Sequence, residues 1–159
     1  MDETDGRLLR YVFAAEVALL ALPTIGVLAQ FIAALAFFAY GGVLFTVYRL
    51  VTFSEDATLS QLVFTGLLSA LVTAAFVAIW QFASLSVAYI VGQNVRTAKH
   101  RRKFWNGLWA SVVPMMLTLS ATLREIYAQE SDPLWLIYFS GLPMLVPVLH
   151  LAVATSLDD

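Results

Sequence analysis

Four long runs of apolar residues constrain this chain more than any other feature. They cover residues 11–48, 59–93, 104–123 and 134–157 of the 159-residue sequence. A membrane helix needs about 20 mainly apolar residues to cross a hydrocarbon core about 30 Å thick, and each run reaches that length. Charged residues make up 13% of the chain, against about 25% in an average soluble domain. Since so few charges cannot cover a soluble globule, we predict an all-α integral membrane protein.

The run 11–48 could form one membrane span or two, because a helix of this length would extend about 57 Å. The basic residues distinguish these alternatives. With four spans in total, seven Lys and Arg residues lie on one side of the membrane and two on the other, whereas splitting the first run gives five against four. The positive-inside rule favours the first arrangement. We therefore predict one four-helix domain, 1–159, in the cell membrane, with the N- and C-termini both cytoplasmic.

The first two helices are expected to be longer than the bilayer is thick. The predicted spans are residues 24–48, 59–81, 104–123 and 134–157. Residues 11–27 and 82–93 then overhang the inner face as apolar helix. Because a bare apolar surface of this size is not stable in water, the overhangs must pack together or lie along the membrane after a bend at Pro23.

Glu16 places a carboxylate inside the first overhang. An isolated charge in an apolar environment is costly, so this side chain must pair, take up a proton or face water. An antiparallel register centred on Phe38 and Ala70 puts it close to Gln93 and within about one turn of Arg96. A structural ion pair and a gating or ion-attracting acid at the cytoplasmic mouth both fit this placement.

Three other polar side chains within the apolar runs are candidates for a pore or gate, together with Glu16. Gln30 and Gln81 lie at the same expected depth, where two amides can bond each other or line a path in an oligomer. His150 follows Pro143 and Pro147, which predict a bend in the last helix, and it fits a structural hydrogen bond or a proton relay.

Small and hydroxyl residues recur at helical spacing on the second and third helices. Such stripes are typical of helix-packing faces, since they allow close approach and hydrogen bonds between helices, and a pore lining has a similar composition. The residues of the stripe are Gly66, Ser69, Thr73, Ser84, Ser111, Thr118 and Thr122.

The loop between the second and third helices is strongly basic. Its cations set the orientation of the chain in the membrane and attract anionic lipid headgroups at the inner face. They are Arg96, Lys99, Arg101, Arg102 and Lys103.

The sequence lacks the motifs that catalysis would require. It has no cysteine and only two histidines, and it contains no HExxH, GxSxG or phosphate-binding glycine motif. We therefore expect neither a cofactor nor a metal site, and nothing specific in the sequence supports enzymatic activity. The net charge of −2 argues against a nucleic-acid partner.

Apolar overhangs and small-residue faces favour association between copies of the chain. The function expected first is therefore a homo-oligomeric pore or channel that passes ions or small solutes passively, with the first two helices lining the path. One alternative is a non-catalytic accessory subunit that packs against a partner subunit in a larger membrane complex. Another is a small secondary transporter that uses His150 and the proline-broken last helix.

Overall fold

The computed structural model describes residues 3–52, 59–128, 137–138 and 140–156, and within these ranges the regular structure is helical, with no strand. The predicted last span, 134–157, therefore lies partly outside the described residues. The all-α prediction is confirmed.

Three helices are long and apolar enough to cross a membrane, and a fourth is shorter. The first is a continuous path of α1 (Glu3–Glu16), the π-helix η1 (Val17–Ala21) and α2 (Leu22–Val51). The others are α3 (Leu59–Ile90), α4 (Ala98–Ala128) and, after the 3-10 helix η2 (Leu142–Met144), the short helix α6 (Leu145–Ser156). The predicted long first and second helices are thus present.

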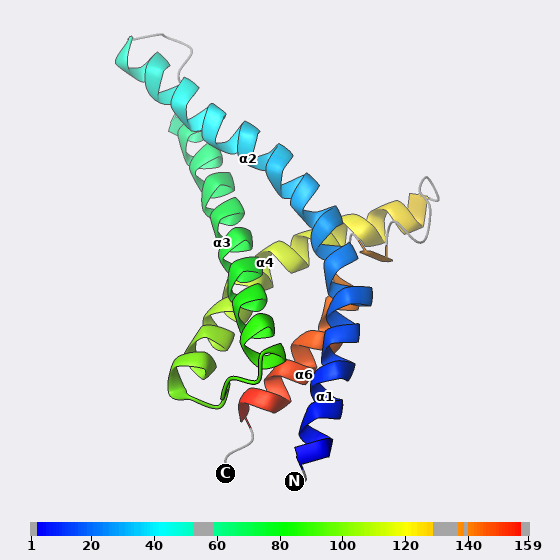
Figure 1. Ribbon diagram of the computed structural model, residues 1–159. Coiled ribbons are helices and arrows are strands. Elements are labelled where there is room, and N and C mark those ends of the chain that lie inside the picture. The colour runs from blue at the N-terminus through cyan, green and yellow to red at the C-terminus, as the bar shows by residue number, and fades with distance from the viewer. Residues whose placement is uncertain (1–2, 53–58, 129–136, 139, 157–159) are drawn as a thin grey trace.

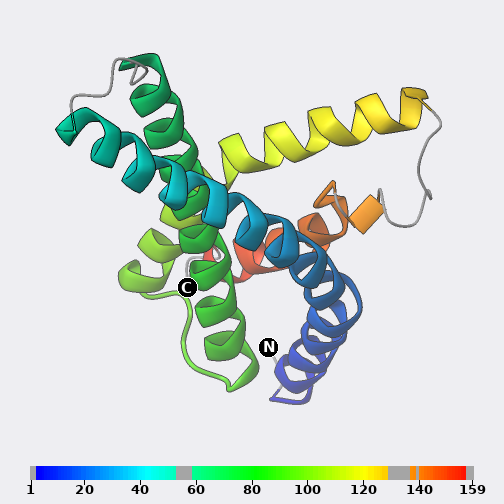
Figure 2. The same ribbon diagram turned by 90° about the horizontal axis from the view of Figure 1, so that it is seen from above.

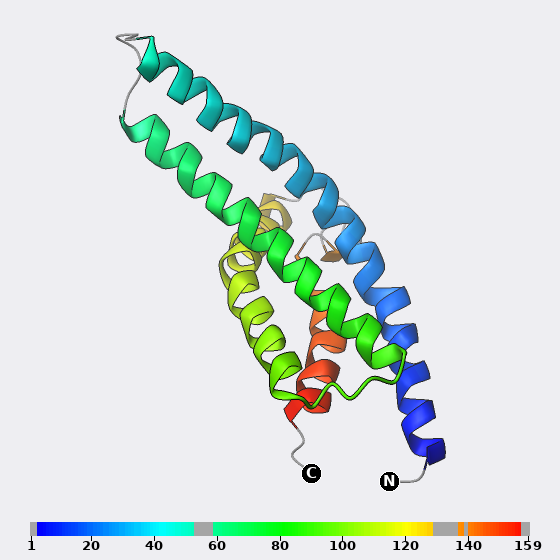
Figure 3. The same cartoon turned by 60° about the vertical axis from the view of Figure 1, so that its left-hand side comes forward.

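The helices α2 and α3 form a long antiparallel hairpin, which Figures 1 and 3 show at one end of the molecule. At the other end, α1 lies beside α6 and the lower half of α3. The helix α4 packs against α3 near its own start and then leans away from the hairpin, with Pro114 inside it. The start of α1, the end of α6 and the connection between α3 and α4 all lie at this second end (Figure 1).

The hairpin keeps the register that the sequence predicts. Tyr40 and Thr73 share a hydrogen bond of 2.8 Å between their hydroxyl oxygens. A Cβ on Gly42 would lie 2.9 Å from a methyl carbon of Thr65, so the two backbones approach closely there. The expected pairing of Phe38 with Ala70 would set Gly42 opposite Gly66, one residue from the Thr65 that it approaches.

The register of the first overhang differs from the prediction. The guanidinium of Arg10 lies against Gly92, and the ring of Phe13 packs edge-on against Tyr89 with centroids 5.0 Å apart. Glu16 therefore lies about two turns of helix away from the predicted neighbour Gln93, and that part of the prediction is wrong. The reason is that the first helix bends where α1 joins α2 through η1, so a straight extrapolation from the hairpin fails (Figure 1).

Residues of both predicted overhangs are helical and pack against the rest of the bundle on one face. An apolar core forms where four helices meet at the lower end, and it includes Phe13, Phe82, Leu85, Phe104 and Leu151. Phe13 has no exposed surface at all. The contacts of α1 with α3 and α6 thus cover one face of the overhangs, while Tyr11, Leu19 and Val91 on their other faces stay exposed.

The described part of the last predicted span is not one continuous helix. Gly141 has φ 77°, in the left-handed region that favours glycine, and the 3-10 helix η2 follows it. Pro143 lies in η2 and Pro147 in the first turn of α6, where a missing N–H group is tolerated, and the regular helix that follows is α6. Its 12 residues extend about 18 Å, less than the roughly 30 Å of a hydrocarbon core.

Candidate functional site

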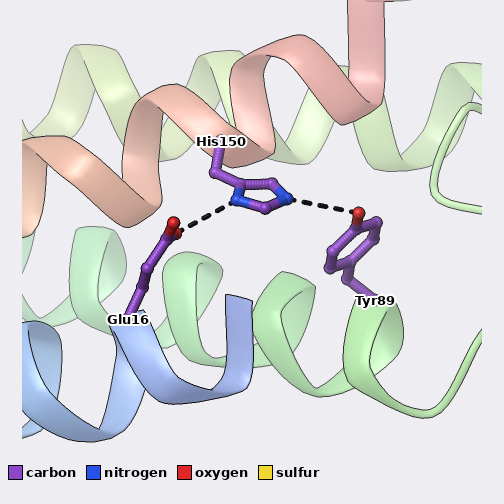
Figure 4. Close-up of polar contacts among 3 residues, drawn as sticks. All are labelled: Glu16, Tyr89 and His150. Carbon is purple, nitrogen blue, oxygen red and sulfur yellow. Dashed lines mark hydrogen bonds and ion pairs between the residues drawn. The ribbon is translucent and has the colours of Figure 1, made fainter. Parts of the chain in front are cut away.

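The interruption of the first helix and the start of α6 meet at the lower end of the bundle. The π-helix η1 interrupts the first helix, the 3-10 helix η2 precedes α6, and these two irregular segments contact each other. Three polar side chains lie beside this contact, namely Glu16, Tyr89 and His150 (Figure 4). We call these three residues the polar junction.

The sequence around Pro23 explains the interruption of the first helix. The backbone N–H of Leu22 donates to the carbonyl of Val17, five residues back rather than the four of an α-helix. Pro23 has no N–H to donate, and its ring disfavours a regular turn before it. The buried hydroxyl of Thr24 donates to the carbonyl of Leu20 at 2.6 Å. The predicted bend is therefore present as a π-helix just before Pro23, and Glu16 is the last residue before it.

Each member of the polar junction comes from a different helix. The Oε2 of Glu16 lies 3.1 Å from Nδ1 of His150, so the carboxylate of α1 accepts from the imidazole of α6. The other ring nitrogen, Nε2, lies 3.3 Å from the hydroxyl oxygen of Tyr89 on α3. Figure 4 shows His150 between the other two side chains.

This geometry suits both protonation states of the histidine. In the neutral form Nδ1–H donates to Glu16, and Nε2 accepts from the tyrosine hydroxyl. In the charged form both N–H groups donate, because the tyrosine oxygen can accept a hydrogen bond as well as donate one. His150 can therefore gain or lose a proton without breaking the hydrogen-bond chain.

Apolar and charged neighbours surround the polar junction. The ring of the buried Phe13 packs against both His150 and Tyr89, at 5.0 Å between centroids in each case. Arg10 and Arg96 lie close enough to interact electrostatically with Tyr89, as does Glu16. Arg10 also donates through Nε to the carbonyl of Gly6 at 3.1 Å.

The polar junction is only partly covered. The side chains of His150 and Glu16 are 17% and 21% exposed. Among the side chains that the structure describes, Glu16 is the only carboxylate, and no group of three potential metal ligands occurs. The polar junction is therefore a chain of hydrogen bonds between one carboxylate, one imidazole and one phenol.

A cavity of about 360 Å³ lies next to the polar junction, between the hairpin, α4 and the segment η2–α6. Its walls are almost entirely apolar and include Ile32, Val72, Leu85, Phe104 and Leu151. It is partly open rather than enclosed. The structure thus provides an apolar binding space that the sequence did not predict.

The two predicted glutamines do not line one space. Gln30 is exposed on α2, whereas Gln81 lines the cavity and packs against Gly107 of α4, where a Cβ would lie 2.9 Å from that of Gln81. Among the described residues, Oε1 of Gln81 is buried and has no hydrogen-bond partner.

The hydroxyls of the small-residue stripe are satisfied within their own helices. Ser69, Thr73, Ser84, Ser111, Thr118 and Thr122 each donate to a carbonyl three or four residues back, at 2.7–3.0 Å. Gly66 lies on an exposed part of α3, with open space where a side chain would be. The stripe therefore does not form a polar path through a single chain.

The residues of the predicted basic loop form a separate surface, and those from Lys99 to Lys103 lie in the first turns of α4 rather than in a loop. Lys99, Arg102 and Lys103 line a shallow hollow of about 390 Å³ together with Ala98 and Asn106. Trp105 and Trp109 are exposed on the same helix. Cations beside exposed tryptophans are typical of a membrane–water interface.

Sequence reasoning found Glu16 and His150 but missed Tyr89 and Phe13. A lone tyrosine and a lone phenylalanine within apolar helices carry no local signal of a hydrogen-bond network. Comparison with family models, curated proteins and solved structures gives no match to this chain.

Proposed function

We propose that this protein is a small secondary transporter in the cell membrane, which couples proton exchange at the polar junction to movement of a solute, with both termini cytoplasmic. The observation that carries the proposal is the Glu16–His150 pair, held where the interrupted first helix meets the start of α6. Interrupted helices line binding sites in many transporters. Ionisable residues within membrane bundles commonly belong to ion or proton pathways.

The helix that carries His150, α6, and the helix that carries Tyr89, α3, also form part of the cavity wall. On α6, His150 contacts Glu16 while its neighbours Val148 and Leu151 line the cavity. On α3, Leu85 lines the cavity one turn before Tyr89. A shift of α6 relative to α1 therefore changes the cavity and the polar junction together.

Protonation supplies the force for such a shift. When His150 is charged, it forms a charge-assisted hydrogen bond to Glu16, which is stronger than the bond of the neutral ring. When either side chain changes its charge, the attraction that holds α6 to α1 changes as well. Proton binding and cavity shape are then linked, as coupled transport requires.

The test is proton movement in proteoliposomes with a trapped pH-sensitive dye and a potassium-diffusion potential. The purified protein is expected to raise the proton flux above that of protein-free vesicles. Glu16→Gln and His150→Asn are each expected to lower this flux at least tenfold. The matched control is His100→Asn, because His100 bonds Thr97 in the basic loop at 2.8 Å, away from the polar junction.

Absence of proton flux in the wild-type protein contradicts the proposal, as does a flux in both junction variants equal to that of the wild-type protein. A flux of potassium or chloride as large as that of protons would instead indicate a passive pore.

The homo-oligomeric pore is the second candidate, and the exposed stripe on α3 favours it. Gly66 and Thr73 lie on a face that is exposed in the single chain, and small residues on such a face allow close helix association. Gly66→Leu is then expected to convert the oligomer to a monomer in mild detergent and to abolish potassium flux. A stoichiometric second protein that copurifies would support the accessory-subunit alternative.

The basic loop completes the proposal for the membrane orientation. Lys99, Arg102 and Lys103 line one hollow at the same end as the start of α1 and the end of α6. We place this end at the cytoplasmic leaflet, where anionic headgroups neutralise these cations.

A further inference from the structure

We infer that the cavity between α2, α3, α4 and α6 is a substrate site for an apolar molecule that carries a single hydrogen-bonding group. The inference rests on the proposed transport function and adds the substrate class to it.

The lining of the cavity selects an apolar ligand. Side chains from all four helices contribute, and nearly every one is aliphatic or aromatic; the polar exceptions are Gln81, Ser111 and Thr118. Its volume of about 360 Å³ falls in the range of about 300–1,000 Å³ that holds small organic ligands. A hydrated ion would lose its water here and gain almost no compensating contact.

Gln81 is the group that can recognise a polar atom on the ligand. The hydroxyls of Ser111 and Thr118 already donate to the carbonyls of Leu108 and Met115. The amide oxygen of Gln81, in contrast, has no partner among the described residues. The last torsion of a glutamine side chain turns easily, so its amide can present either atom to the cavity.

The shape of the bundle gives this ligand a route from the bilayer. The cavity is partly open, and both α2 and α4 contribute to its lining. Figure 2 shows these two helices crossing rather than running side by side. In a chain with three membrane-length helices, the solvent at such an opening is lipid. A molecule dissolved in the bilayer can therefore enter without crossing water, and its single polar group gains a hydrogen bond at Gln81.

The test uses N-phenyl-1-naphthylamine, which has one N–H donor, and 1-benzylnaphthalene, in which a CH₂ group replaces that N–H. Binding of the tritiated amine to the purified protein in detergent is measured by scintillation proximity, with the hydrocarbon as competitor. The wild-type protein is expected to bind the amine about fivefold more tightly, which corresponds to one net hydrogen bond. In Gln81→Leu the two affinities are expected to become equal.

Two substitutions that fill the cavity provide the second measurement. Ala78→Leu on α3 and Ser111→Leu on α4 both place a larger side chain in the lining and are expected to lower the affinity for both molecules at least tenfold. The matched control is Ala70→Leu on α3, which is exposed and outside the lining. Thermal unfolding in the same detergent checks that each variant is folded.

Three results would overturn the inference. They are no saturable binding above that of empty micelles, equal wild-type affinities for the two molecules, and unchanged binding in both cavity-filling variants. Equal affinities would indicate a groove for hydrocarbon chains of lipids. Because binding is measured without a proton gradient, saturable binding with the predicted preference but no proton flux would refute the transport function and leave the site intact.

Discussion

The carboxylate of Glu16 lies 3.1 Å from Nδ1 of His150, although 134 positions separate these residues in the chain. This contact joins the end of α1 to α6 immediately beside the π-helix that interrupts the first membrane helix. The hydroxyl of Tyr89 completes the chain of hydrogen bonds from α3. Three helices are thus joined through one imidazole, and the predictions below begin there.

The Glu16–His150 pair is expected to contribute measurable coupling energy. In a double-mutant cycle with Glu16→Gln and His150→Asn, unfolding in detergent should give a coupling of about 1 kcal/mol, the net value of one hydrogen bond. A cycle that combines Glu16→Gln with His100→Asn should give a coupling near zero, since His100 lies in the basic loop. Equal coupling in both cycles would show that the pair is not formed.

A comparison of Tyr89→Phe with Tyr40→Phe tests whether the hydroxyl of Tyr89 contributes to proton movement as well as to stability. Each of Tyr89→Phe and Tyr40→Phe removes one hydroxyl hydrogen bond, to His150 and Thr73 respectively. Both are expected to lower the free energy of unfolding by about 1 kcal/mol. Proton flux should fall in Tyr89→Phe alone, because Tyr40 lies in the hairpin. A similar loss of flux in both would mean that the effect comes from stability.

The end of α3 requires glycine at position 92. Gly92 has φ 84°, and the N–H groups of Gly92 and Gln93 bond back to the carbonyls of Tyr89 and Ala88, which closes the helix in a Schellman motif. Gly92→Ala should destabilise the protein by about 1–2 kcal/mol through backbone strain, and its Cβ should also displace Arg10.

Gly141→Ala is the control for this effect, because Gly141 has φ 77° but open space around it. The two substitutions should therefore carry similar strain. In thermal unfolding, Arg10→Ala should relieve part of the cost of Gly92→Ala and none of the cost of Gly141→Ala. Fully additive effects in both combinations would contradict the contact of Arg10 with Gly92.

Gly107 sets the distance between α3 and α4. A Cβ there would lie 2.9 Å from the Cβ of Gln81, so Gly107→Ala must push the helices apart. Thermal unfolding should show a loss of about 1–3 kcal/mol, as expected for overpacking. Gly66→Ala meets nothing within 4 Å and should leave the stability of the single chain unchanged or higher, since alanine favours helix. A larger loss for Gly66→Ala than for Gly107→Ala would refute the packing described here.

The absence of cysteine from the sequence allows a direct test of orientation. Lys99→Cys in the basic loop should react with a membrane-impermeant maleimide only after the cells are permeabilised. Thr52→Cys lies where α2 ends, far from Lys99, and should react in intact cells. Labelling of the two positions in the reverse order would invert the proposed topology.

Much of the fold could be predicted from the sequence because membrane crossing is a local property. The lengths of the apolar runs predicted the long first and second helices, and Pro23 predicted the bend that appears as the π-helix. The last predicted span lies partly outside the described residues. Within the described part, Gly141 and the 3-10 helix η2 break the helix before α6, and a local reading of Pro143 and Pro147 as a kink does not predict this break.

The candidate site was predictable only in its separate parts. Glu16 and His150 stood out because polar groups within apolar runs are costly unless they are satisfied. Their pairing did not stand out, because it depends on how α1, α3 and α6 cross. Gln30 and Gln81 were predicted to lie together because they have equal depth along two helices. Equal depth does not put two side chains on facing surfaces, and the structure keeps these two apart.

The sequence alone thus determined that the chain is helical, that its helices are long enough to cross a membrane, and that a carboxylate near Pro23 needs a partner. Hydropathy and backbone chemistry act over a few turns of helix, so they can be read residue by residue. The tertiary structure decided that the partner is His150, that Tyr89 joins it, and that an apolar cavity lies behind them. Crossing angles and the bend at η1 decide these contacts, and they arise from the packing of the whole bundle.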